Sequence, residues 1–380
     1  MAQHPQAHPI SAVHRLLRGG LIWLPALLLA GCFQDVKEST VHPQTDTGRV
    51  IQHVYALVTW IDAVIFLIVL GLLLWAVFRY RESRFKPGEV PKQVHGNPML
   101  ELVWTVIPAV ILVFIAVPTW QGIFRAAEPP TTDPVKVEAV GHQWFWEFDY
   151  PDKGFVTGNE MHLPLNRPAL VHTTSKDVIH SFWVPRLAGK IDAIPGKENL
   201  VWFTPEVAGT FYGQCAEFCG TSHANMRMRV VVESQADFDA WVARMKQPQL
   251  ASTPEAKEGE ALFAQKFCVV CHTINGRPDA AGQVGPNLTD LRDRTTIAAG
   301  LLDNTAANLS HWIRAPRSIK PGVKMCWPPV DSPDAACGPL PVSEDEAQKI
   351  ITYLDSPSAG ATADYLQKAQ GAAGATAQMK

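Results

Sequence analysis

Two long apolar stretches place the strongest limit on how this chain can fold. Residues 54–78 and 100–120 are almost free of charged side chains. Each is close to the ~20 residues that a helix needs to cross the hydrocarbon of a bilayer, where the backbone must satisfy its own hydrogen bonds. The sequence therefore predicts a helical hairpin in a membrane over residues 54–120. Two buried helices of a soluble core are the alternative, and the length of the stretches favours the membrane.

The segment between the two stretches predicts the orientation of the hairpin. It carries a group of basic residues: Arg79, Arg81, Arg84, Lys86 and Lys92. Short loops rich in Lys and Arg stay in the cytoplasm. Both ends of the hairpin, and everything that follows it, are therefore predicted to lie outside the cytoplasm.

Residues 1–31 have the form of a secretory signal peptide. Arg15 and Arg18 precede an apolar run at residues 21–30 that is too short to span a bilayer. The run ends in Leu29-Ala30-Gly31-Cys32, which resembles a bacterial lipobox and implies a lipid anchor at Cys32. An ordinary signal followed by an incidental cysteine is the alternative. We expect a protein of the bacterial plasma membrane, with residues 32–53 as the N-terminal segment of the mature chain.

The residue pattern changes after a Pro-rich linker at residues 121–134. Residues 135–247 contain short runs of β-branched and aromatic residues, separated by turn signals. The clearest runs cover residues 135–140, 143–150, 199–204 and 226–232. This pattern is typical of an all-β sandwich or barrel, and a short helix at 238–245 is predicted to close it.

A small, mostly helical module is predicted for residues 258–356, after a linker at 248–257. A helical pattern at 256–266 precedes a Cys-x-x-Cys-His motif, and a later helix at 343–354 begins with Ser343 and Glu346 at capping-box spacing. Residues 357–380 are rich in Ala, Gly and Gln and lack apolar periodicity. We expect that tail to be disordered.

The segment from Cys215 to Met226 is the strongest candidate metal site. It holds Cys215, Cys219, His223 and Met226 within one short loop. Thiolate, imidazole and thioether ligands favour copper over Mg, Ca or Mn. The two thiolates would bridge two copper ions, His223 and a distant His180 would each bind one, and Met226 and the main-chain carbonyl of Glu217 would be weak axial ligands. A disulfide or a redox-active pair of thiols is the alternative.

The motif Cys268-Val-Val-Cys271-His272 predicts covalent attachment of a c-type haem. Both thiols would bond the haem, and His272 would be the proximal iron ligand. Met325 is the preferred sixth ligand, with His311 as the rival. A zinc site is a weaker interpretation, because no second ligand pair follows at zinc spacing.

Cys326 and Cys337 remain once the other cysteines are assigned to lipid, copper and haem. An oxidising compartment permits them to form a disulfide. Two unpaired thiols are the alternative, since spacing alone does not determine pairing.

Four motifs together resemble subunit II of haem-copper cytochrome c oxidase, which holds a dinuclear CuA centre in a cupredoxin domain. They are Gly141-His-Gln-Trp-Phe-Trp146, His180-Ser-Phe-Trp-Val-Pro185, Asp192-Ala-Ile-Pro-Gly196 and the Cys215–Met226 loop. The resemblance spans about residues 50 to 235, and the later module is similar to a class I cytochrome c, as in caa3-type oxidases. It implies a transmembrane α-helical hairpin, then a cupredoxin-like Greek-key barrel, then a small all-α cytochrome c domain.

The resemblance also implies roles for single residues. Trp144 would pass electrons to CuA, although Phe145 stands where the family often has Tyr. The Glu217 side chain would help to hold a magnesium ion at the contact with subunit I. Glu101 would open a proton-uptake path, and a carboxylate at the end of a span is functional by default. A carboxylate that only reaches the membrane interface is the alternative for Glu101.

One departure concerns the residues after Met325. Cytochrome c modules commonly continue Met-Pro, whereas Cys326-Trp-Pro-Pro follows here. We therefore expect an altered loop in this region, with the ligation by Met325 retained.

The sequence thus predicts the electron-input subunit of a proton-translocating oxidoreductase. A periplasmic cytochrome c or similar donor would reduce the haem, and the electron would pass to CuA and on to a haem of subunit I for O2 reduction. A CuA-type nitric oxide reductase subunit and a membrane copper-delivery protein are the alternatives. The net charge of −3 is small, and no run of like charge indicates nucleic acid as a partner.

Overall fold

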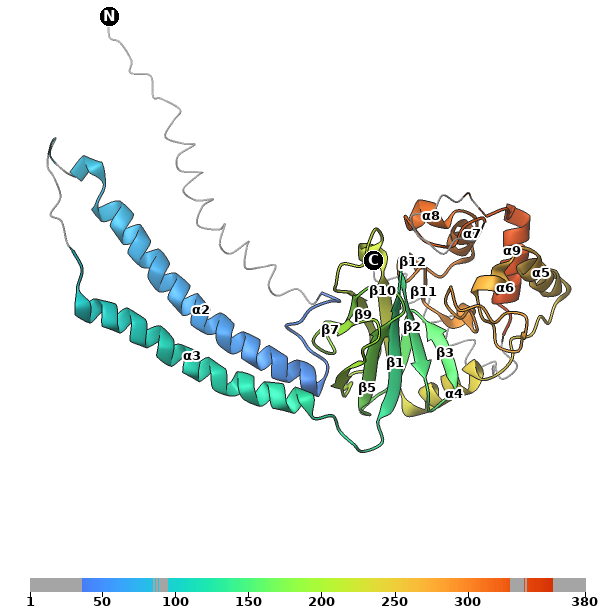
Figure 1. Cartoon of the computed structure of the whole chain (residues 1–380), viewed down its shortest axis with the longest axis horizontal. Coiled ribbons are helices and arrows are strands. Elements are labelled where there is room, and N and C mark those ends of the chain that lie inside the picture. Colours follow the sequence, from blue (N-terminus) through green and yellow to red (C-terminus); the bar gives the residue numbers. More distant parts are fainter. Residues whose placement is uncertain are drawn as a thin grey trace, which may run out of the picture.

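The computed structural model describes residues 36–84, 86, 88, 95–328, 338 and 340–357. Within these ranges the chain forms a pair of long helices, a β domain and a smaller helical module, in that order (Figure 1). The predictions for residues 1–35, Cys337 and residues 358–380 fall outside the described part. Cys326 is disulfide-bonded.

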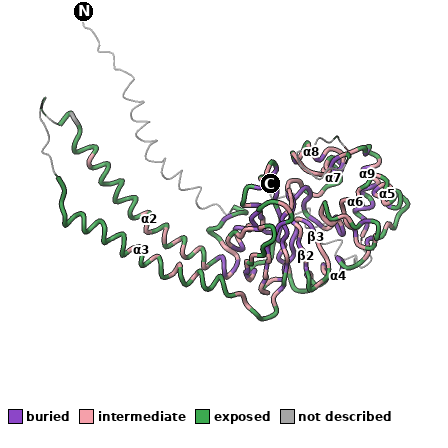
Figure 2. The backbone as a smooth tube through the Cα atoms, in the orientation of Figure 1, coloured by how far each residue is buried: buried purple, intermediate pink, exposed green. Residues whose placement is uncertain are grey.

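The two long helices are α2 (Asp46–Arg79) and α3 (Pro98–Ala127), with a short turn, η2 (Glu82–Arg84), after the first. Most residues of both helices are exposed (green in Figure 2), and both helices are long and apolar enough to cross a membrane. Each helix begins before the apolar stretch, because Thr45 accepts a hydrogen bond from the amide of Gly48 and Asn97 caps α3. The chain is a membrane protein with a two-helix hairpin, as predicted.

The outer ends of both helices are fastened to the β domain. The hydroxyl of Thr45 donates to the carbonyl of Leu187 at 2.5 Å, and the Asp46 carboxylate accepts from the amide of Thr204 at 2.9 Å. The indole of Trp202 donates to the carbonyl of Ala126 at 2.7 Å. The hairpin therefore meets the β domain at two separate points, one on each helix.

The β domain consists of two five-stranded sheets. One has the order β3-β2-β1-β5-β8, and the other has the order β4-β10-β9-β6-β7. The strands of the first sheet are β1 (Val135–His142), β2 (Phe145–Tyr150), β3 (Phe155–Gly158), β5 (Ala169–Ser175) and β8 (Asn199–Phe203). The strands of the second are β4 (Glu160–Pro164), β6 (His180–Trp183), β7 (Ile191–Ala193), β9 (Gly209–Cys215) and β10 (Arg227–Glu233).

The two sheets enclose an aromatic core. Its largest buried side chains include Trp146, Phe148, Tyr150 and Phe182. Both sheets mix parallel and antiparallel pairs: β1 runs parallel to β5, and β4 runs parallel to β10. Helix α4 (Gln235–Met245) packs Trp241 against Tyr150, which confirms the predicted closing helix and extends it by one turn at its start. This is the all-β domain that the sequence predicts.

The helical module begins with α5 (Pro254–Gln265) and ends with α9 (Glu344–Leu354). The capping box between Ser343 and Glu346 is formed. Helices α5 and α9 cross closely at Gly259, where an added Cβ would lie 1.8 Å from the carbonyl oxygen of Lys349. Between them lie α6 (Cys268–Cys271), η4 (Leu291–Asp293), β11 (Thr296–Ile297), β12 (Leu302–Asp303), α7 (Ala306–Arg314) and α8 (Pro316–Ile319).

Buried charges join the β domain to the helical module. Glu160 on β4 is 1% exposed and accepts hydrogen bonds from the backbone amides and hydroxyls of Thr295 and Thr296. Arg244 of α4 contacts the same segment of the module, where it lies 3.4 Å from Asp290 and 3.2 Å from Asp293. The module is thus bound to the β domain through paired charges.

Candidate metal centres

The copper-type ligand set comes from the second sheet. Cys215 ends β9, Cys219 lies in the loop that follows, and His223 opens the short turn η3 (His223–Asn225). Met226 immediately precedes β10, and His180 opens β6. Because β9 lies between β6 and β10, the sheet order brings the distant His180 to the loop.

The six donor groups meet at short distances. Cys215 Sγ lies 3.7 Å from Cys219 Sγ and 3.8 Å from His180 Nδ1. Cys219 Sγ lies 3.6 Å from His223 Nδ1 and 3.9 Å from Met226 Sδ. The main-chain carbonyl of Glu217 is 3.2 Å from Cys215 Sγ. Each sulfur therefore has one imidazole beside it and one weaker donor.

This donor set fits a pair of soft metal ions. The two thiols are free cysteines, and a separation of 3.7 Å is far longer than the ~2.05 Å of a disulfide. His180, Cys215 and Cys219 offer ligand atoms that all lie within 4.8 Å of one another. His180 and Met226 are 0% exposed, and the cysteines are also buried, so water is kept from the ligands. Thiolate and imidazole in this arrangement suit copper.

Asp177 holds His180 in place, and sequence reasoning missed it. The carboxylate of Asp177 lies 2.8 Å from His180 Nε2 and also accepts from the amide of Gln143 at 2.7 Å. The contact leaves Nδ1 facing Cys215, which is the orienting role that carboxylates play for metal-binding histidines. Although burial opposes it, these hydrogen bonds lower the pKa of Asp177. The only hint in the sequence is that Asp177 stands three residues before His180.

Trp144 lies against the same loop. Its indole Nε1 donates to the carbonyl of Cys219 at 3.0 Å, and Gln143 Nε2 donates to the same oxygen at 2.9 Å. Trp144 is 2% exposed. Strand β2 begins only at Phe145, two residues later than predicted, because Gln143 and Trp144 form the turn that carries these contacts.

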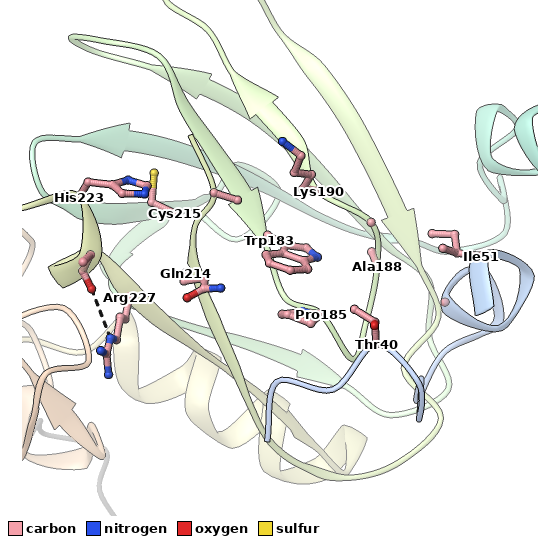
Figure 3. Close-up of a pocket in the computed structure, with 14 residues that line it drawn as sticks. Thr40, Ile51, Trp183, Pro185, Ala188, Lys190, Gln214, Cys215, His223 and Arg227 are labelled. Carbon is pink, nitrogen blue, oxygen red and sulfur yellow. Dashed lines mark hydrogen bonds between the residues drawn. The ribbon is translucent and has the colours of Figure 1, made fainter. Parts of the chain in front are cut away.

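A hollow of about 750 Å³ lies beside the copper-type loop. It runs from Cys215 and His223, past Trp183, to Ile51 at the start of α2 (Figure 3). Glu217 and Phe218 are exposed on the loop, and Phe218 is 76% exposed. Glu101 lies in the first turn of α3, at the end of the hairpin far from the β domain (Figure 1). The structure therefore brings Glu217 to the loop and leaves Glu101 remote from it.

The haem-type residues surround a second cavity, in the helical module. Cys268, Cys271, His272 and Met325 line it together with apolar side chains that include Phe263. His272 Nδ1 lies 2.8 Å from the carbonyl of Pro286, which fixes the ring and frees Nε2 as a ligand. A Cβ at Gly285 would lie 2.6 Å from the His272 ring, so a larger residue there would displace it.

The rival sixth ligand lies elsewhere. His311 is exposed and its Nε2 lies 3.0 Å from the hydroxyl of Ser318. Met325 and His272, by contrast, both line the cavity. Two thiols, a fixed imidazole and a thioether around an apolar cavity fit a c-type haem. Burial lowers the pKa of His272, which keeps its imidazole neutral and able to bind a metal.

Comparison with known families assigns all three parts of the chain. Residues 41–121 match the transmembrane domain of cytochrome c oxidase subunit II, and residues 154–235 match the periplasmic domain of the same subunit. Residues 256–358 match cytochrome c. The families follow the same order along the chain as the hairpin, the β domain and the helical module.

Individual relatives agree. The chain is 36% identical over 338 residues to cytochrome c oxidase subunit 2 of Alkalihalophilus pseudofirmus, covering 87% of this chain and 94% of that protein. It is 37% identical to the same subunit of Bacillus sp. strain PS3, covering 80% and 90%. It also resembles the periplasmic domain of subunit II (CoxB) of Bradyrhizobium japonicum, with 38% identity, a TM-score of 0.30, and coverage of 31% of this chain and 97% of that one. The chain belongs to the cytochrome c oxidase subunit II family and carries a cytochrome c domain after its copper-type domain.

Proposed function

We propose that this chain is the electron-input subunit of a haem-copper cytochrome c oxidase. Electrons from a periplasmic cytochrome c or similar donor pass through the haem c of this chain to CuA, and then to a haem of subunit I. There they reduce O2 in a reaction coupled to proton pumping. The proposal places the metal domains on the periplasmic side of a bacterial plasma membrane, with a lipid anchor at Cys32.

One observation supports the proposed route of electrons from the haem to the copper pair. Trp144 is part of the wall of the haem-type cavity, and its indole donates a hydrogen bond to the carbonyl of Cys219. A single side chain thus connects the two ligand sets. When bound, the haem and the copper pair supply one-electron redox chemistry, in which iron loses the electron that copper gains and no bond is broken.

The residues of the chain divide the remaining work. His180, Cys215, Cys219, His223 and Met226 would hold the copper ions, and Asp177 orients His180. Cys268, Cys271, His272 and Met325 would hold the haem. The buried His180, Cys215, Cys219 and Met226 would let an electron arrive at the copper pair with little movement of the surrounding atoms.

The resemblance to the family implies roles for two carboxylates. Glu217 is exposed beside the copper-type loop, and we propose that its side chain shares a magnesium ion with subunit I. Glu101 lies at the cytoplasmic end of α3 in the topology that the basic connector predicts, and we propose that it opens a proton-uptake path there.

The test is metal analysis and spectroscopy of the purified full chain. We expect two copper ions and one iron per chain, a c-type haem spectrum and mixed-valence CuA absorption. Rapid reduction of the haem should be followed by reduction of CuA, and Trp144→Phe should slow that step without loss of metal. A single Cu(I) that mild chelators remove would instead indicate a copper-delivery protein.

A further inference from the structure

One short turn connects the segment that carries Met325 to the loop between Cys215 and Met226. Residues 320–322, which we name the docking turn, follow α8 and stand a few residues before Met325. The turn is closed by hydrogen bonds from Lys320 N to the carbonyl of Pro316 at 2.9 Å and from Val323 N to the carbonyl of Lys320 at 3.2 Å. It therefore has a defined shape of its own.

Each residue of the docking turn contacts the copper domain. The ammonium group of Lys320 donates to the carbonyl of Trp144, and also to the carbonyl of Ala298 in the haem-binding module at 3.4 Å. The hydroxyl of Ser222, next to His223, donates to the carbonyl of Pro321 at 2.5 Å. At Gly322, an added Cβ would lie 2.9 Å from Cη2 of the Trp144 ring.

Lysine is an unusual residue at a buried position such as 320. Its side chain is 2% exposed, and burial lowers its pKa to about 7. A buried ammonium group is costly unless its hydrogens are accepted, and here carbonyls from both domains accept them. A lysine that served only to fill space would be replaced by an apolar residue at lower cost.

We propose that Lys320 is a positioning residue for electron transfer within this chain: through the docking turn it holds the Met325 loop against Trp144 and the copper loop. The inference rests on the proposed haem-to-CuA route. It goes beyond that route by naming what fixes the separation of the two centres.

The test uses the detergent-solubilised full chain with both centres loaded. A light-activated ruthenium reductant reduces the haem, and the absorption of CuA reports the arrival of the electron. Lys320→Met removes the charged contact and is expected to slow haem-to-CuA transfer by about tenfold or more, since small displacements of reacting groups have effects of that order. Lys257→Met, the same change at an exposed position on α5, should leave the rate unchanged.

A second variant disturbs the contact between the docking turn and Trp144 without removing a charge. Gly322→Ala pushes a methyl group toward the Trp144 ring at a φ of +77°. Gly154→Ala is its matched control, because Gly154 has the same φ of +77° and nothing within 4 Å of the added Cβ. Transfer should slow in Gly322→Ala and keep its wild-type rate in Gly154→Ala.

The outcomes separate the two proposals. Slower transfer in Lys320→Met and Gly322→Ala, with unchanged metal content, CuA spectrum and thermal unfolding, supports the positioning role. Wild-type transfer rates in a folded, loaded Lys320→Met or in Gly322→Ala overturn it, and if Lys320→Met does not fold, Gly322→Ala decides. An absence of haem-to-CuA transfer in the wild-type chain itself overturns the proposed function, and the positioning role with it.

Discussion

Replacing Glu160 by Gln should weaken the attachment of the helical (haem-binding) module to the β (copper) domain. Four donors converge on Oε1 of this buried carboxylate: the amides of Thr295 and Thr296 at 2.9 and 3.0 Å, and their hydroxyls at 2.8 and 3.1 Å. The carboxylate also supplies negative charge beside the buried Arg229 and Arg294. The substitution keeps the shape of the side chain and removes the charge.

The expected loss follows from the number of these hydrogen bonds. A hydrogen bond to a charged group contributes roughly 1.5–3 kcal/mol and one between neutral groups roughly 0.5–1.5 kcal/mol, so each bond to Glu160 loses about 1 kcal/mol. Because the bonds share one oxygen and are not additive, we expect the free energy of unfolding of the haem-binding module to fall by about 2–4 kcal/mol.

Guanidinium unfolding of the detergent-solubilised chain, followed by the haem absorption of the Met325-ligated state, measures this change. With an m value of about 3 kcal/mol per M, the midpoint should fall by about 1 M. The control is Glu258→Gln, which removes an exposed partner of Lys349 at an N–O distance of 3.1 Å, and the midpoint is expected to stay at its wild-type value there. If Glu160→Gln and the control gave equal midpoints, the interface would not depend on this carboxylate.

Three further results are expected. Gly259→Ala should destabilise the haem-binding module by about 1–3 kcal/mol or more in the same assay, because the methyl group would overlap the carbonyl of Lys349; an unchanged midpoint would contradict the close crossing of α5 and α9. Burial and the neighbouring Asp290 raise the pKa of Asp293 to about 6, so the folded state binds the extra proton, and this stabilising contribution is lost as pH rises from 4 through 6. Asp293→Asn should therefore become more stable relative to wild type between pH 4 and pH 7, and a difference that does not vary with pH would refute the assignment. Cys219→Ser should lose copper and retain iron on metal analysis, whereas retention of the full copper content would remove Cys219 from the ligand set.

The proposed metal ligands could be named from the sequence because their chemistry is local in sequence. Cys215, Cys219, His223 and Met226 share one loop, and Cys268, Cys271 and His272 share one motif, so residue type and spacing were enough to propose them. The two membrane helices were predictable for a similar reason, since length and hydropathy are properties of a continuous segment. Their caps extended them beyond the apolar stretches, as Thr45 and Asn97 show.

The residues that support the sites were not predictable in this way. Glu160 and Lys320 are ordinary charged residues in the sequence, and each acquires its role from a segment that folding brings to it. Asp177 is close to His180 in the sequence, but only the structure shows that its carboxylate contacts the imidazole. Strand β4 escaped prediction because all five of its residues are buried, so the alternation that marks a half-exposed strand is absent. The alternation of apolar and polar residues indicates which face of a strand is buried. It cannot show that a second domain covers the other face.

Fastening the hairpin at Thr45, Asp46 and Trp202 removes the freedom that a linker would otherwise give the β domain. A domain held by a single flexible linker can rotate and change its distance from the membrane. Attachment to both helices restricts these movements. The depth of the copper loop relative to the bilayer is thus set within this chain, before any neighbouring subunit binds. In the proposed oxidase, a neighbouring subunit would then meet the copper-type loop at a height that this chain has already fixed.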